Sequence, residues 1–223
     1  MGRMHDGYLI ARATAITLRD SERTDQIHVV EELTSRGRMA ALLAKHAGDP
    51  ELQDLLRNQP ELRSDQVDYD QLRALPADTL GGRYVRHLDD NGITADYQAA
   101  PSPHVEDPIL GYLVRRFRQT HDVWHALIEL GTAPHEEVII HAFSWGQLRL
   151  PVSAMVLFFG TLKHLVLERR WGALRGALRE AYQHGLSAAP LMPVYWERLW
   201  EQPLDQVRAR YRVQPCTRAL VDS

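Results

Sequence analysis

The sequence predicts a single all-α domain that spans residues 1–223. Glycines and prolines fall at the boundaries of segments whose apolar residues recur every three or four positions, the period of an amphipathic helix. No segment shows the strict alternation of a half-buried strand. A chain of 223 residues with 44% hydrophobic composition can bury one sizeable core, and no linker or repeat divides it. We therefore expect one compact multi-helix domain.

Capping signals predict most of the helix boundaries. Asp49-Pro50 and Asp107-Pro108 each pair a capping aspartate with a proline at the first helical position, and Asp20-Ser21 is a further cap. Residues 93–106, which are rich in alanine and proline, are expected to form a loop. With their caps included, the predicted helices cover residues 20–46, 49–59, 69–75, 79–88, 107–130, 132–149, 151–167, 171–184, 193–200 and 203–211.

The composition excludes several classes of protein. A net charge of −3 and a pI near 6.4 lack the basic footprint of a nucleic-acid-binding protein, so we expect no nucleic-acid partner. The single cysteine, Cys216, excludes an internal disulfide and a thiolate metal site. No long apolar run follows Met1, so we expect no signal peptide. The chain also begins without a mitochondrial-type leader, which favours a cytoplasmic, bacterial protein, either free or peripheral at the inner membrane.

The most apolar window covers residues 150–167. Lys163 and His164 interrupt it, and it is shorter than the roughly 20 residues that a membrane-spanning helix needs. The window predicts a buried core helix, and the alternative is a helix that faces lipid or rests on a membrane.

One motif points directly to chemistry. His121-Asp122-x-x-His125 is followed after eleven residues by Glu137, and imidazole nitrogens with carboxylate oxygens are ligands that Zn²⁺ and Fe²⁺ accept. On a helical wheel the first three residues share an arc of about 100° at the border of the buried face. The short turn at residues 131–134 folds the next helix back, so that Glu137 can reach both histidines. The sequence therefore predicts a divalent-metal site between two consecutive helices.

Simpler explanations exist for each residue alone. A single histidine at the edge of a core is more often a hydrogen-bonded structural residue, and Asp122 or Glu137 alone would be a surface carboxylate. Asp122 can either bind the ion or orient a histidine. The lack of cysteine in the motif and its His/carboxylate set favour an open, catalytic site over a closed, structural one.

Residues around the motif are secondary candidates. Glu129 and His141 each follow a predicted ligand by one helical turn and could orient the ligands. Arg115, Arg116 and Arg118 form a basic run that predicts a solvated face, with a bound headgroup or substrate carboxylate as the alternative.

Four segments resemble the coenzyme Q (ubiquinone) biosynthesis protein 4 family. They are residues 75–84 (LPADTLGGRY), 115–125 (RRFRQTHDVWH), Glu137, and 195–204 (YWERLWEQPL), and the resemblance covers about residues 20–213. It implies an all-helical fold and a divalent ion, zinc or iron, bound by His121, Asp122, His125 and Glu137. It also implies an apolar cavity for a prenyl tail.

The resemblance implies an enzyme of quinone biosynthesis. Its reaction would remove the C1 carboxyl of a prenylated 4-hydroxybenzoate-derived ring with hydroxylation there, and Asp122 and Glu137 would be the catalytic residues. Hydrophobicity and resemblance together place the tail along residues 152–167. The candidate substrate contacts are Arg115, Arg118, Trp124, Met155, Phe158 and Phe159. Further implied partners are other quinone-biosynthesis enzymes, a membrane surface and a second copy of the chain.

Two other functions stay open. The first is a non-catalytic scaffold that presents prenyl lipids to partner enzymes. The second is a zinc hydrolase in which Glu137 or Glu129 acts as general base on a zinc-bound water. Residues 94–104 depart from the family pattern, so a natural-product substrate other than a ubiquinone precursor is also open.

Overall fold

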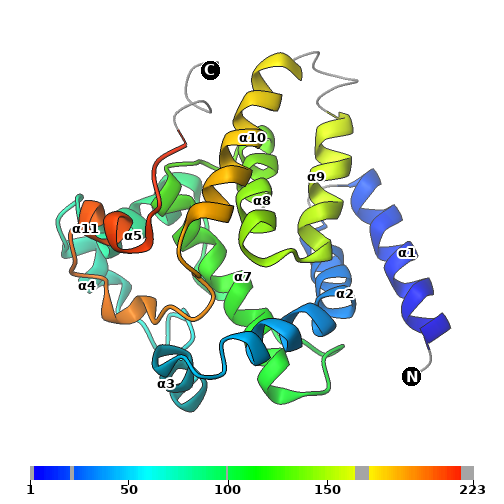
Figure 1. Cartoon of the computed structure of the whole chain (residues 1–223), viewed down its shortest axis with the longest axis horizontal. Helices are drawn as coiled ribbons and strands as arrows, with labels where there is room; N and C mark the ends of the chain where they lie inside the picture. Colours follow the sequence, from blue (N-terminus) through cyan, green and yellow to red (C-terminus); the bar gives the residue numbers. More distant parts are fainter. Residues whose placement is uncertain (1–2, 21–22, 99, 164–170, 217–223) are drawn as a thin grey trace.

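The computed structural model describes residues 3–20, 23–98, 100–163 and 171–216, and these residues form a helical domain. The helices are α1 (Arg3–Arg19), α2 (Thr24–Lys45), α3 (Pro50–Asn58), α4 (Tyr69–Ala74), α5 (Leu80–Asn91), α6 (Ala95–Gln98), α7 (Pro108–Ile128), α8 (Pro134–Leu148), α9 (Pro151–Lys163), α10 (Trp171–Ser187), the 3₁₀ turn η2 (Trp196–Arg198) and α11 (Leu204–Tyr211). Helix α7 runs through the middle, between α4, α5 and α11 on one side and α8, α9 and α10 on the other (Figure 1). The described residues hold no strand longer than one isolated bridge, which confirms the all-α prediction.

The Asp-Pro signals mark two helix starts as predicted. Asp49 accepts a hydrogen bond from the Glu51 backbone N–H at the start of α3, and Asp107 does the same for two backbone N–H groups of α7. The predicted cap at Asp20-Ser21 is wrong in position, because α2 begins at Thr24 and Ser21 lies outside the described residues. Helix α1 and the short α6, within the expected loop, were not predicted.

Two later segments differ from the prediction. Helix α10 continues through Gly185 to Ser187, because this glycine packs against α8 rather than ending the helix. A Cβ atom at Gly185 would lie 2.2 Å from the carbonyl oxygen of Phe143, so only glycine permits this close approach. Residues 193–200, expected to be helical, contain only the 3₁₀ turn η2.

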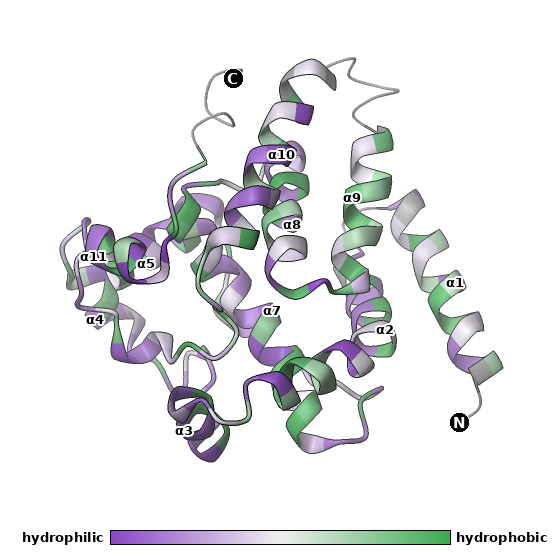
Figure 2. Cartoon of the chain, viewed as in Figure 1, coloured by the Kyte–Doolittle hydropathy of each residue, from purple (hydrophilic) through white to green (hydrophobic). Residues whose placement is uncertain are grey.

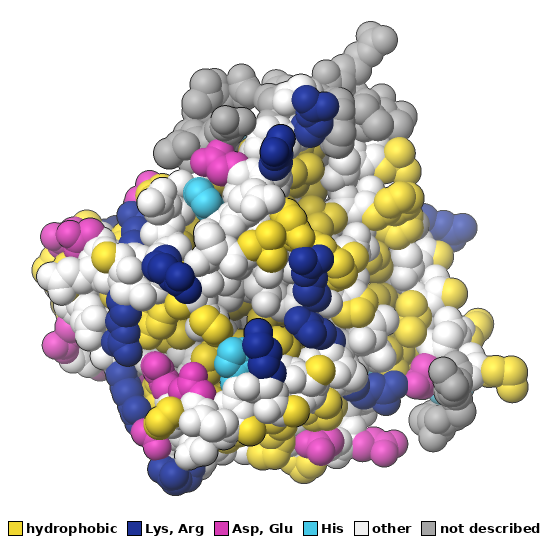
Figure 3. Space-filling model, in the orientation of Figure 1, with side chains coloured by type: hydrophobic (Ala, Val, Ile, Leu, Met, Phe, Trp, Pro, Cys, Tyr) yellow, Lys and Arg dark blue, Asp and Glu magenta, His cyan; other side chains and the backbone are white. Residues whose placement is uncertain are grey.

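Helix α9 is only partly the buried core helix that its sequence predicts. Val152 and Ser153 are buried, but Phe158 is 65% exposed and Leu162 is 46% exposed. Figure 2 shows α9 as a largely hydrophobic helix, and hydrophobic side chains gather on the same side of the surface in Figure 3. Among the described helices, none is both long and apolar enough to cross a bilayer. Residues 164–167 of the predicted helix lie outside the described residues.

Two of the three arginines in the basic run of α7 are buried and Arg115 is part-exposed, so the predicted solvated face is wrong. Arg116 is 2% exposed and Arg118 is 4% exposed. Arg118 donates hydrogen bonds to Glu31 at 2.9 Å and to Glu32 at 3.1 Å, both on α2. Arg115 pairs less deeply with a third acid, Glu61, at 3.2 Å. Helix α7 can carry these charges inside the molecule because each guanidinium meets a carboxylate from another part of the chain.

The two outer segments of the family resemblance pack against each other. The backbone N–H of Leu80 donates to the carbonyl oxygen of Gln202, and that of Gly81 donates to Trp200, both at 2.9 Å. The rings of Tyr84 and Trp200 stack with centroids 5.3 Å apart and planes 4° apart. These contacts fix α5 against the C-terminal stretch and thereby set the position of α5 beside α7.

We expect Gly185→Ala to destabilise the protein by about 1–3 kcal/mol, because the added methyl group must push α8 and α10 apart. Gly37→Ala is the control, since an added Cβ at this exposed position in α2 meets nothing within 4 Å. This control should leave stability unchanged or raise it by up to about 1 kcal/mol. Urea unfolding followed by circular dichroism measures both, and equal stability of the two variants would contradict the close packing at Gly185.

We expect Arg118→Met to destabilise the protein by about 3–5 kcal/mol, because it leaves two buried carboxylates without their cation. Arg115→Met is the matched control on the same helix. It removes a more exposed ion pair and should cost no more than about 1 kcal/mol. The free energies of unfolding in urea give the comparison, and a similar loss in both variants would show that the Arg118 pair does not hold α7 to α2.

Candidate metal centre

The structure brings three of the four predicted ligands together. His121 and His125 project from α7, and their Nε2 atoms are 3.1 Å apart. Glu137, in the first turn of α8, places one carboxylate oxygen 3.5 Å from the Nε2 of His121 and the other 3.5 Å from the Nε2 of His125. One potential ligand atom from each residue lies within 4.8 Å of the other two. His121 and Glu137 are part-exposed, and His125 is buried.

A turn between α7 and α8 positions Glu137. Helix α7 ends at Ile128, and Glu129 follows in the left-handed conformation with φ 57°. The carboxylate of Glu136 accepts hydrogen bonds from the backbone N–H groups of Gly131 at 2.9 Å and Ala133 at 3.1 Å. Glu136 thus caps α8, and the next residue, Glu137, is directed across the turn to α7.

The arrangement fits a divalent ion. Two donors on one ion, at bond lengths of about 2.0–2.2 Å and angles of about 90–110°, lie about 3.0–3.5 Å apart. The two Nε2 atoms, 3.1 Å apart, agree with this range, and so does each Nε2 with the carboxylate oxygen that faces it, at 3.5 Å. The two oxygens of Glu137 thus each face one histidine. The Nδ1 of His125 lies 3.3 Å from the carbonyl oxygen of Leu130 and donates to it, which leaves its Nε2 lone pair free to bind a metal.

Glu137 and the two histidines affect one another's charge, as the pKa values of Glu137 and His125 show. Burial raises the pKa of Glu137, but hydrogen bonds from His121 and His125 outweigh burial and hold the pKa well below its usual value. Burial lowers the pKa of His125, but the hydrogen bond and charge of Glu137 outweigh it and leave this pKa raised from 6.5. The carboxylate therefore stabilises positive charge at this point, whether a proton or a metal ion supplies it.

Asp122 is adjacent to this group but is not part of it. Its side chain is buried, its Oδ2 has no hydrogen-bond partner among the described residues, and burial raises its pKa. The three residues whose ligand atoms gather do not include Asp122. Burial raises the pKa of Tyr69 and Tyr84, and the charge of Asp122 adds a smaller contribution to both.

Two further histidines flank the group. The ring of His141, which was predicted, lies 5.3 Å from the ring of His121, and its Nδ1 is 3.3 Å from the hydroxyl of Ser153. The ring of His87 on α5 stacks on His125, with centroids 5.1 Å apart and planes 17° apart. Burial lowers the pKa of both His87 and His141 to about 3.

His87 was not predicted as a site residue, although the sequence carries a signal for it. It falls on the same helical stripe as Leu80, Tyr84 and Leu88, all of which are buried. The ring nitrogens of a histidine in a buried apolar stripe need hydrogen-bond partners, which come either from neighbouring residues or from a bound ligand.

Glu129 and the predicted substrate contacts lie in several places. The carboxylate of Glu129 accepts a hydrogen bond from Arg208 at 2.9 Å, which ties the end of α7 to α11. Trp124 is buried in the core, edge-on to Phe117 and Phe143. Met155 is part-buried and accepts a hydrogen bond from Thr14.

The rings of Phe158 and Phe159 contact each other, with centroids 5.0 Å apart. Phe158 is largely exposed and Phe159 is half-buried. Trp124 therefore belongs to the core, whereas the phenylalanine pair belongs to the surface of α9.

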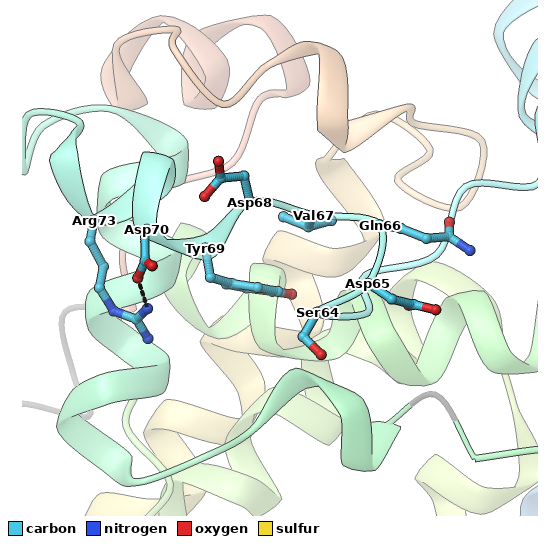
Figure 4. A pocket seen from close by; sticks show the side chains of 8 residues that line it. All are labelled: Ser64, Asp65, Gln66, Val67, Asp68, Tyr69, Asp70 and Arg73. Atoms are coloured by element: carbon cyan, nitrogen blue, oxygen red, sulfur yellow. Dashed lines mark hydrogen bonds and ion pairs between the residues drawn. The ribbon is translucent and has the colours of Figure 1, made fainter.

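A polar hollow of about 570 Å³ lies on the surface where the chain enters α4 (Figure 4). None of the three clustered metal-ligand candidates lines it. Tyr69 lines it, and its hydroxyl is 3.5 Å from that of Tyr84. The lining residues are Ser64, Asp65, Gln66, Val67, Asp68, Tyr69, Asp70 and Arg73.

Comparisons with known proteins identify a family. The family described as "Coenzyme Q (ubiquinone) biosynthesis protein Coq4" matches residues 2–217. A mitochondrial ubiquinone biosynthesis protein COQ4 homolog from Drosophila ananassae is 33% identical over 199 residues, which cover 89% of this chain and 74% of that protein. The mitochondrial ubiquinone biosynthesis protein COQ4 of Coprinopsis cinerea is 28% identical over 205 residues, which cover 92% of this chain and 70% of that protein.

A solved structure shares the fold. The crystal structure of a Nostoc punctiforme protein, provisionally assigned to ubiquinone biosynthesis, superposes with a TM-score of 0.72 at 24% identity. The match covers 92% of this chain and 97% of the other. The expected cytoplasmic localisation is contradicted, because the similar proteins from Drosophila and Coprinopsis are named as mitochondrial. By its match over nearly the whole sequence, the chain belongs to the Coq4 family of coenzyme Q (ubiquinone) biosynthesis proteins.

Proposed function

We propose that this protein is a metal-dependent enzyme of ubiquinone-type biosynthesis. Its substrate is a prenylated 4-hydroxybenzoate-derived acid or a similar carboxylated, lipid-like molecule, and its reaction is oxidative decarboxylation at the ring carbon that carries the carboxyl group. The convergence of two imidazole nitrogens and one carboxylate on a space that one ion can fill carries the proposal. Family membership supports the place in quinone biosynthesis.

The protein supplies three ligands, His121, His125 and Glu137, and therefore leaves coordination positions for substrate oxygens. A bound divalent ion would supply Lewis-acid stabilisation of a carboxylate or phenolate oxygen and, if it is iron, access to O₂ as the oxidant. In this reaction the carboxyl group leaves as CO₂ and one oxygen atom of O₂ takes its place on the ring as a hydroxyl. The other oxygen atom leaves as water, with two electrons and two protons from an external reductant. Glu137 balances part of the positive charge in the site, and the carbonyl of Leu130 fixes the ring of His125.

Asp122 is the residue we assign to proton transfer. Its Oδ2 is buried and has no partner, and burial favours the protonated form. A carboxyl group in such surroundings can hold a proton next to the ligands and release it to a neighbouring oxygen. Its position one residue after His121 also keeps it available to orient that histidine.

We expect about one divalent ion per chain, and we expect His121→Ala and Glu137→Ala each to abolish its binding because each removes one of three ligands. His46→Ala, at the end of α2, is the control and should keep the full metal content. Elemental analysis of purified proteins after dialysis gives the stoichiometry. Full metal content in both ligand variants would refute the metal site.

The affinity for the metal should decrease as the pH is lowered, because protons compete with the ion for the same imidazole nitrogen of His125. The pKa of His125 is raised from 6.5, so a growing fraction of its imidazole is protonated as the pH falls through that raised value. Below it, the affinity for zinc should drop by about tenfold per pH unit for this one proton. Zinc titrations between about pH 8 and about pH 5.5 measure the slope, and a flat profile would contradict a histidine ligand with this pKa.

The second candidate function is a non-catalytic carrier of prenyl lipids. The exposed apolar residues of α9, Phe158 and Leu162, favour it, because large apolar side chains on a surface mark sites for lipids or partners. Asp122→Asn separates the two functions. An enzyme should lose most of its turnover of a prenylated hydroxybenzoate, whereas a carrier should keep its effect on the pathway and still co-purify with lipid in native mass spectrometry.

A further inference from the structure

His87 is a buried polar residue that the fold leaves incompletely satisfied. Its side chain is 8% exposed, and its Nε2 has no hydrogen-bond partner among the described residues. Buried polar atoms are nearly always hydrogen-bonded, and leaving one without a partner costs about 1–3 kcal/mol. An unpartnered ring nitrogen next to a candidate metal site therefore calls for a ligand atom as its partner.

A neighbouring amide determines which ring nitrogen of His87 carries the proton. The Nδ2 of Asn91 donates to the backbone oxygen of His87 at 2.7 Å, and the hydroxyl of Thr132 donates to the Oδ1 of Asn91 at 2.8 Å. These two bonds orient the amide so that its nitrogen faces the Nδ1 of His87, at 3.5 Å. Nδ1 is therefore an acceptor, and the ring proton sits on Nε2, which makes Nε2–H a donor without an acceptor.

The position of His87 shows what that acceptor can be. Its ring stacks on His125, whose Nε2 faces the shared space with His121 and Glu137. His87 is not one of the residues whose ligand atoms gather, so it borders the metal site without being a ligand in it. A fixed N–H donor beside a site that could hold a divalent ion matches a negatively charged oxygen, which such an ion would also attract.

We propose that His87 is a substrate-binding residue whose Nε2–H donates a hydrogen bond to the carboxylate or phenolate oxygen of an aromatic acid. The proposal rests on the proposed function and specifies it further. An ion held by His121, His125 and Glu137 would attract the oxygens of the acid through its positive charge, and His87 selects the orientation in which one oxygen meets its N–H. Asn91 and Thr132 are positioning residues, because they act only through the tautomer and orientation of His87.

The test measures the affinity of the full-length, zinc-loaded protein for 4-hydroxybenzoate by calorimetry. His87→Phe keeps a flat ring next to His125 but has no donor, and we expect the Kd to rise by about tenfold to a hundredfold. His87→Gln places an amide N–H near the original Nε2 and should keep most of the affinity. Zinc content and thermal stability are measured on the same samples, since a purely structural role of His87 would change these instead.

Two results would overturn the proposal. One is a wild-type affinity for 4-hydroxybenzoate in His87→Phe, and the other is no measurable binding of this probe by the wild type. If Phe disturbs the site, the imidazole ¹⁵N signals of the wild type decide instead. Nε2 of His87 must be protonated, and its signal must shift when the probe is added.

The zinc titration of the wild type, made before any probe is added, tests the proposed function separately. A wild type that takes up no zinc refutes the metal site. In that case the affinities of the wild type and of His87→Phe for 4-hydroxybenzoate are measured without metal, and their comparison still tests the role of His87.

Discussion

The candidate metal centre depends on the capped turn between α7 and α8. The carboxylate of Glu136 accepts from the backbone N–H groups of Gly131 and Ala133, and this closes the turn tightly enough for α8 to fold back on α7. A Cβ atom at Gly131 would lie 2.7 Å from the Oε2 of Glu136, so a side chain at this position would have to displace the capping carboxylate. Since Glu137 follows the capping residue directly, the same two hydrogen bonds determine whether its carboxylate reaches His121 and His125.

Helix α7 is held by charge as well as by apolar packing. Arg116 makes a two-point contact with Glu197, at 2.6 and 2.8 Å, and Arg118 lies between Glu31 and Glu32. Each of these carboxylates comes from a segment far from α7 in the sequence, so the ion pairs connect α7 to α2 and to the C-terminal stretch. Buried pairs of this kind restrict a helix to one depth and rotation, because any shift would leave a buried charge unpaired. These ion pairs therefore leave little freedom to His121 and His125, which lie one to three turns after the arginines on α7.

Local signals in the sequence predicted the parts of the structure that local interactions determine. Asp49 and Asp107 cap their helices through backbone N–H groups two or three residues away, and His121 and His125 share a helix face because they are four residues apart. The burial of Arg118 could not be predicted in this way, since its partners Glu31 and Glu32 lie 87 and 86 residues away. A run of arginines has the same composition whether it faces water or buried acids.

Long-range packing also explains the other differences. Gly185 was expected to end a helix, but it serves a close contact between α8 and α10, because glycine suits both purposes and the sequence does not distinguish them. His87 was missed since its neighbour His125 lies 38 positions further along the chain, on another helix. The motif predicted three ligands on one helix and a fourth on the next, and the structure gathers His121, His125 and Glu137 but not Asp122. His141 was predicted beside them from its place one turn after Glu137, whereas His87 became visible only when α5 was placed beside α7.

The unpaired polar atoms bear on the choice between an enzyme and a lipid carrier. A carrier needs an apolar surface, and α9 offers exposed Phe158 and Leu162. It does not need a buried N–H at His87 and a buried carboxylate oxygen at Asp122 that both lack partners, since each costs stability. Unpartnered buried atoms also occur elsewhere in the described residues, for example at Ser35 and Ser102, so the location of these two carries the argument. The ring of His87 stacks on His125, and Asp122 follows His121 in the sequence. An apolar helix can deliver a prenyl substrate to an enzyme as well as to a partner protein, so the surface of α9 is compatible with both functions, whereas the two unpaired atoms favour chemistry.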